Sequence, residues 1–154
     1  MLALVISGCA SEPGAGYINK NDILGAWNCN YNIVREENGV TSTVIMDTKE
    51  SYLRNGRSNA FGVMKVKISP EFPEIQYSMA GTATWKLTGK YLILEATDIK
   101  LVNLTHPQLE SILKMQDMFP SGMSDSSEIM QLTENEMTLR SESTNEIYKC
   151  SKAF

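Results

Sequence analysis

The sequence predicts an all-β protein, an antiparallel β-barrel of about eight strands with one helix between strands five and six. Two observations favour this fold class. Apolar and polar residues alternate with a period of two along most of the chain, and turn signals such as Asn55-Gly56 separate the alternating runs. About eight strands in hairpin order must protect their edges, and closure into a barrel removes both edges. An open sandwich of two sheets is the alternative.

The first three strands are predicted before the first pair of prolines. From Trp27 to Ile33, apolar residues alternate with asparagines, which is typical of a half-buried strand. A second strand is predicted over 41–53, because this run is rich in Thr, Val, Ile and Tyr and ends at the Asn55-Gly56 turn. A third strand is predicted over 64–68, where Met, Val and Ile alternate with lysines.

The fourth and fifth strands follow Pro70 and Pro73. Alternation over 75–87 predicts one strand longer than usual, so we expect Gly81 to mark a bulge or a bend that curves the sheet. A turn at 88–90 then leads into a β-rich run over 91–102.

One helix is predicted over 105–118. Thr105 and Gln108 have the spacing of a capping box, Pro107 suits a first helical turn, and apolar residues follow at helical spacing. The segment 119–127 is small and polar, which predicts a mobile loop. Three short strands are then predicted over 128–132, 137–142 and 146–151.

The N-terminus predicts an exported, lipid-anchored protein. Ile6-Ser7-Gly8-Cys9 resembles the lipobox of bacterial lipoproteins, in which the signal peptide is cut before an acylated cysteine. On this resemblance, 1–8 are a truncated signal peptide, 9–21 are the lipidated Cys9 with a flexible tether, and 22–154 are the barrel domain. Ala10 after the cysteine implies anchoring to the outer membrane, facing the periplasm. A buried first strand is the alternative.

The cysteine count fits the same compartment. Acylation of Cys9 leaves Cys29 and Cys150, and an exported pair is normally a disulfide. Such a bond would bring the first and last strands together, which favours closure of the barrel. Two separately buried thiols are the alternative.

A second resemblance covers most of the predicted barrel. Leu24-Gly25-Ala26-Trp27 resembles the Gly-x-Trp signature of lipocalins, and Trp85-Lys86-Leu87-Thr88-Gly89 is similar to small bacterial lipocalin-like lipoproteins. The resemblance implies a lipocalin-like barrel in which a late basic residue packs against the early tryptophan. On this basis Trp27 and Arg140 form the barrel-closing pair, as a cation-π contact. A solvent-exposed strand arginine is the alternative.

Composition and motifs argue against several function classes. The net charge is −4 and no Lys/Arg cluster with interleaved aromatic residues is present, so we expect no nucleic-acid partner. His106 is the single histidine, which leaves no common zinc site and no triad with a nucleophile elbow. We therefore expect neither catalysis, nor a metal, nor another cofactor.

Two function classes remain open. In the first, the barrel binds a small hydrophobic or amphipathic ligand, and the pocket walls are the inward-facing Trp27, Tyr31, Tyr77, Met79 and Trp85. In the second, side chains fill the barrel, and its surface holds an envelope protein in a structural, assembly or sensory role. In both, the lipid anchor is the only contact with the membrane.

Overall fold

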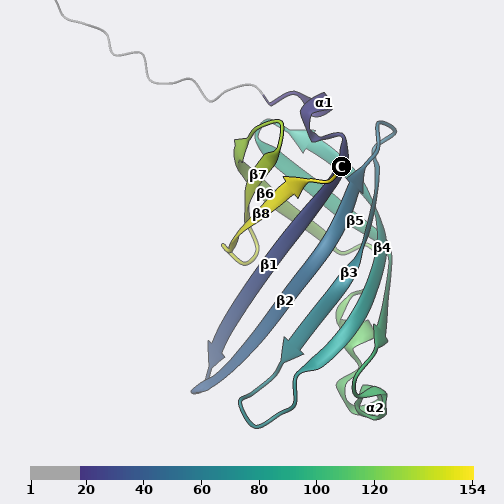
Figure 1. Cartoon of the computed structure of the whole chain (residues 1–154), viewed down its shortest axis with the longest axis vertical. Coiled ribbons are helices and arrows are strands. Elements are labelled where there is room, and N and C mark those ends of the chain that lie inside the picture. Colours follow the sequence, from purple (N-terminus) through teal and green to yellow (C-terminus); the bar gives the residue numbers. More distant parts are fainter. Residues whose placement is uncertain (1–17) are drawn as a thin grey trace, which may run out of the picture.

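A computed structural model describes residues 18–154 and shows a closed barrel of eight antiparallel strands in the order β1 to β8. The predicted fold class is confirmed. The elements are α1 (Lys20–Ile23), β1 (Gly25–Glu37), β2 (Val40–Tyr52), β3 (Arg57–Lys67), β4 (Ile75–Thr88), β5 (Tyr91–Asn103), η1 (Pro107–Leu109), α2 (Glu110–Leu113), η2 (Met115–Met118), β6 (Ser124–Leu132), β7 (Glu136–Ser141) and β8 (Ile147–Lys152) (Figure 1).

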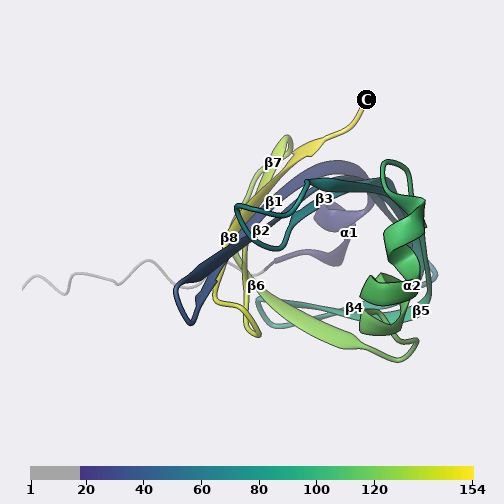
Figure 2. The ribbon, with the colours of Figure 1, turned by 90° about the horizontal axis from the view of Figure 1, so that it is seen from below.

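The barrel is closed all round at one end only. β1 to β5 are long strands, whereas β7 and β8 have six residues each. β1 pairs with β2 along its whole length but with β8 only from Trp27 to Asn30, and β5 pairs with β6 only from Tyr91 to Glu95. Beyond these contacts β1 to β5 continue as a curved sheet, and α2 lies beside β4 and β5 at its far end (Figures 1 and 2).

A plug of buried residues seals the closed end. α1 places Ile23 inside the barrel with no exposed surface, and the indole N–H of the equally buried Trp27 donates to the Ile23 carbonyl at 2.7 Å. The sequence predicted a flexible tether up to residue 21, but α1 already begins at Lys20. A disulfide joins Cys29 and Cys150, as predicted, and locks β1 to β8.

The barrel-closing cation is Lys152, so the predicted pairing of Trp27 with Arg140 is wrong. Lys152 Nζ lies 4.2 Å from the centre of the Trp27 ring and donates to the Leu24 carbonyl at 2.6 Å. Arg140 points outward and pairs with Glu128, because the residues on either side of it, Leu139 and Ser141, are buried on the inner face of β7.

Two core clusters fill the two ends of the barrel. The first surrounds Trp27 and Trp85 at the closed end. The second contains Met64, Ile75 and Tyr77, with Met115 from the connection between β5 and β6.

That connection contains one short α-helix, α2, between the 3-10 turns η1 and η2, so the predicted helix between strands five and six is present but shorter than the expected range 105–118. Lys114 adopts a left-handed conformation with φ of 47°, which ends α2 after Leu113. The hydroxyl of Thr105 accepts from the backbone N–H of Gln76 and caps no helix. The expected loop is shorter too, since β6 already begins at Ser124.

Two local features distinguish the long strands. The register between β4 and β5 shifts between Thr82 and Ala83, next to the predicted bend at Gly81. At Gly62, β3 approaches β2 so closely that a Cβ atom would lie 2.0 Å from the carbonyl oxygen of Asp47. Only glycine fits at Gly62 without a shift of backbone.

Candidate functional site

A cavity of about 160 Å³ lies inside the barrel. It is lined by Glu50 of β2, by three residues of β3, by Met79 and three more residues of β4, and by three residues of β5. Met123, just before β6, and Asp125 of β6 complete the lining. Met123 is 40% exposed, so this wall borders solvent.

Small side chains create this space. Ser58, Ala60, Gly81, Ala83 and Ala96 all line the cavity, on three neighbouring strands. Each lies where the alternation of the strand turns its side toward the interior, but none is large enough to reach the opposite wall. The interior is therefore filled at both ends and hollow between them.

A buried carboxylate forms the polar end of the cavity. The side chain of Glu50 accepts hydrogen bonds from three hydroxyl groups: those of Tyr31 and Thr48 at Oε1, the latter at 3.1 Å, and that of Tyr52 at Oε2, at 2.7 Å. Glu50 is only 8% exposed. These donors hold the carboxylate in one orientation.

The two tyrosines stay protonated donors across the physiological range. Burial above all, and then the charge of Glu50, raise the pKa of both Tyr31 and Tyr52 well above the ordinary value. Tyr31 also stacks on Tyr148, with ring centres 4.3 Å apart, and the hydroxyl of Tyr148 donates to Ser127 at 2.9 Å. The carboxylate is thus supported by a second layer of fixed side chains.

No cation within residues 18–154 pairs with Glu50. The ion pairs of this region are Lys90 with Glu128, Arg140 with Glu128, and Lys100 with Asp98. A second carboxylate, Asp125, lines the cavity and accepts from the hydroxyl of Ser143 at 2.9 Å. The cavity is therefore apolar over most of its wall and carries two acidic groups.

The five residues predicted to form the pocket wall lie in different parts of the barrel interior. Of the five residues, Met79 lines the cavity, and Tyr31 reaches it through its hydrogen bond to Glu50. Trp27 and Trp85 belong to the closed-end core, and Tyr77 to the other core. Sequence reasoning assigned the largest aromatic residues to the wall, but these side chains fill the barrel ends.

Glu50 was missed, although the sequence carries a signal for it. It alternates with Thr48 and Tyr52, and all three are buried on the inner face of β2. A charged residue in phase with a buried face is rare unless it is satisfied by partners or has a function.

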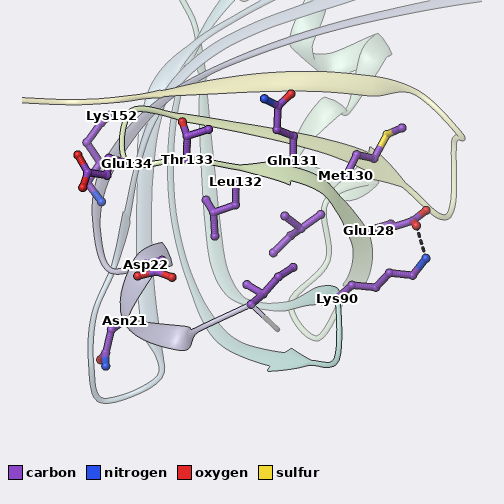
Figure 3. Close-up of a pocket in the computed structure, with 12 residues that line it drawn as sticks. Asn21, Asp22, Lys90, Glu128, Met130, Gln131, Leu132, Thr133, Glu134 and Lys152 are labelled. Carbon is purple, nitrogen blue, oxygen red and sulfur yellow. Dashed lines mark hydrogen bonds and ion pairs between the residues drawn. The ribbon is translucent and has the colours of Figure 1, made fainter. Parts of the chain in front are cut away.

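A second hollow, of about 880 Å³, lies at the closed end between α1, β6 and the turn after β6. Figure 3 shows its mixed lining, with Asp22 and Glu134 on one side and the ion pair of Lys90 with Glu128 on the other. Lys152, also on its rim, is held by Trp27 and Leu24. Several of its charged groups are therefore already engaged.

The fold and the site define a class of protein, a small closed antiparallel β-barrel with a polar-ended cavity that is open to solvent. No protein-family model matches the chain, and no curated protein matches it. Across 18–154, no group of three or more His, Cys, Asp or Glu side chains could hold a metal ion. The same region contains no helix with the length and apolar character needed to cross a bilayer.

Proposed function

We propose that this protein is a non-catalytic lipoprotein of the bacterial envelope, anchored to the outer membrane and facing the periplasm, whose barrel binds a small amphipathic molecule. The observation that carries the binding role is the interior cavity, which combines an apolar wall with the oriented carboxylate of Glu50. A few placed polar groups in an otherwise apolar hollow are typical of ligand sites.

The cavity volume limits the ligand. A cavity of about 150 Å³ in another protein accepts benzene, so the 160 Å³ here suits a molecule of single-ring size. A long acyl chain exceeds this volume. The proposed ligand is therefore a compact molecule rather than a membrane lipid.

The proposed location is supported by two features. The first is the resemblance of Ile6-Ser7-Gly8-Cys9, which lies outside the described residues, to a lipobox. The second is the disulfide between Cys29 and Cys150, because such bonds are typical of oxidising compartments. Labelled palmitate should enter the protein in producing cells, and a Cys9→Ser variant should remain unlabelled. Equal labelling of both proteins would contradict anchoring at Cys9.

Binding is tested with a matched pair of variants on one strand. Ala83→Leu places a larger side chain in the cavity, whereas Ala80→Leu adds the same atoms on the exposed face of β4. In NMR titrations of the isotope-labelled protein with benzyl alcohol, we expect saturable shifts for residues around the cavity. Ala80→Leu should retain these shifts and Ala83→Leu should lose them. Identical titrations of the two variants would contradict binding in the cavity.

A second candidate function is favoured by the two filled ends of the barrel. Typical ligand pockets have about 300–1,000 Å³, which is more than this cavity offers. In this role the barrel is a rigid scaffold, and its surface holds an envelope protein in an assembly or a sensory pathway. This function would be preferred if single-ring probes fail to bind and native mass spectrometry of the gently extracted protein shows no retained small molecule.

A further inference from the structure

We propose that the ligand of the interior cavity is a small primary amine, bound as its ammonium ion against Glu50. This inference rests on the proposed binding function and specifies the chemical class of the ligand. It is carried by the hydrogen-bond geometry of Glu50, by the absence of a cationic partner for this residue within 18–154, and by the apolar wall around it.

Glu50 has room for one more donor. An ionised carboxylate accepts about four hydrogen bonds, two at each oxygen. Oε1 already accepts from Tyr31 and Thr48, whereas Oε2 accepts from Tyr52. The remaining acceptor position is on Oε2, and Glu50 lines the cavity. A ligand with an N–H donor fits this position.

The charge of the site favours a cation over a neutral donor. A buried charge is costly unless it is paired, and none of the ion pairs between residues 18 and 154 involves Glu50. Asp125, on another strand of the same cavity, adds a second negative charge. Both carboxylates favour a positive ligand and repel an anionic one.

The remaining wall selects the rest of the molecule. Met79, Leu94 and Ile99 surround the space with apolar surface, and the small residues of β3 and β4 leave room for about one ring. The ligand that fits is a primary ammonium group joined to a short apolar body. A quaternary ammonium group has the charge but no N–H to donate to Oε2.

The experiment compares probes of one shape and different charge. Benzylamine, which is protonated at neutral pH, and benzyl alcohol have the same number of non-hydrogen atoms. In NMR titrations of the full barrel at neutral pH, we expect benzylamine to bind with a Kd about tenfold or more below that of benzyl alcohol, since hydrogen bonds to charged groups are the stronger ones. Benzoate should bind more weakly than either probe.

A variant pair assigns the preference to Glu50. Glu50→Gln preserves the shape but removes the charge, so the Kd values of benzylamine and benzyl alcohol should become similar. Glu95→Gln removes an exposed carboxylate of β5 and should leave the preference intact. If Glu50→Gln fails to fold, the order of the Kd values of the three probes in the unaltered protein tests the amine assignment.

The outcomes separate the two proposals. Binding of benzyl alcohol as tight as that of benzylamine overturns the amine assignment and leaves the cavity as a binding site. A preference that survives in Glu50→Gln also overturns it. Absence of binding by all three probes overturns the proposed function itself.

Discussion

At the scale of single residues, the closed end depends on how Lys152 is used. Its ammonium group lies over the Trp27 ring and donates to the carbonyl of Leu24, so it joins the end of β8 to the segment between α1 and β1. Partial burial lowers the pKa of the Lys152 ammonium group. The residue therefore acts through position and packing as well as through charge.

Lys152→Ala should destabilise the barrel. The substitution removes the cation-π contact, a hydrogen bond and the packing of the aliphatic stem, and we expect a loss of about 1–2 kcal/mol in the free energy of unfolding. Chemical denaturation followed by tryptophan fluorescence measures it. Lys149→Ala, at an exposed position of the same strand, is the control and should change stability by less than about 0.5 kcal/mol. Equal effects of the two substitutions would refute the role assigned to Lys152.

At the scale of elements, the pairing of β2 with β3 depends on one close backbone contact. Gly62 on β3 allows the backbones of β2 and β3 to approach closely, since the nearest atoms to a Cβ there would be backbone atoms of Asp47 and Thr48. Backbone cannot move aside as a flexible side chain can. The close approach of β2 and β3 at this position therefore depends on one glycine.

Gly62→Ala should strain the β2–β3 pair, because the new methyl group overlaps the Asp47 carbonyl. We expect a loss of at least about 2 kcal/mol in the free energy of unfolding. Gly81→Ala is the matched control: its Cβ would have its nearest neighbour, the Asp98 carbonyl oxygen, at an ordinary 3.5 Å. Urea denaturation of both variants should show a large loss for the first and under about 1 kcal/mol for the second. A mild effect at Gly62 would show that β2 and β3 can separate without penalty.

At the scale of the whole molecule, the disulfide joins the two ends of the barrel sequence. Cys29 and Cys150 are 121 residues apart in the chain and both are buried, on neighbouring strands β1 and β8. These strands pair over a short stretch only, from Trp27 to Asn30. The covalent bond therefore holds the narrowest seam of the barrel.

Replacement of both cysteines by serine should lower stability strongly. Release of a loop of this length gives the unfolded chain more conformational freedom, and we expect a loss of about 4 kcal/mol. Thermal unfolding of the double variant, compared with the oxidised and the reduced parent, measures this effect. The reduced parent should unfold close to the double variant. A melting temperature unchanged by reduction would contradict the stabilising role assigned to the disulfide.

Local patterns in the sequence determined much of this fold. The period of two in 27–33 and 75–87 depends only on which side chains avoid water, so it predicted strands that the barrel contains. The even number of cysteines that remains beside Cys9 likewise predicted a bond between Cys29 in the first strand and Cys150 in the last. Each of these inferences uses neighbours in the chain or a simple count.

Tertiary structure alone decided the site. Lys152 and Arg140 are both basic residues of the last strands, and only their register and facing determine which one meets Trp27. The cavity exists because the closed sheet brings small residues of three strands next to Glu50. Its polar end needs hydroxyl groups from both β1 and β2. Sequence alternation assigns a residue to a face, but the heights at which strands meet depend on register, bulges and curvature, which are long-range properties of the closed sheet.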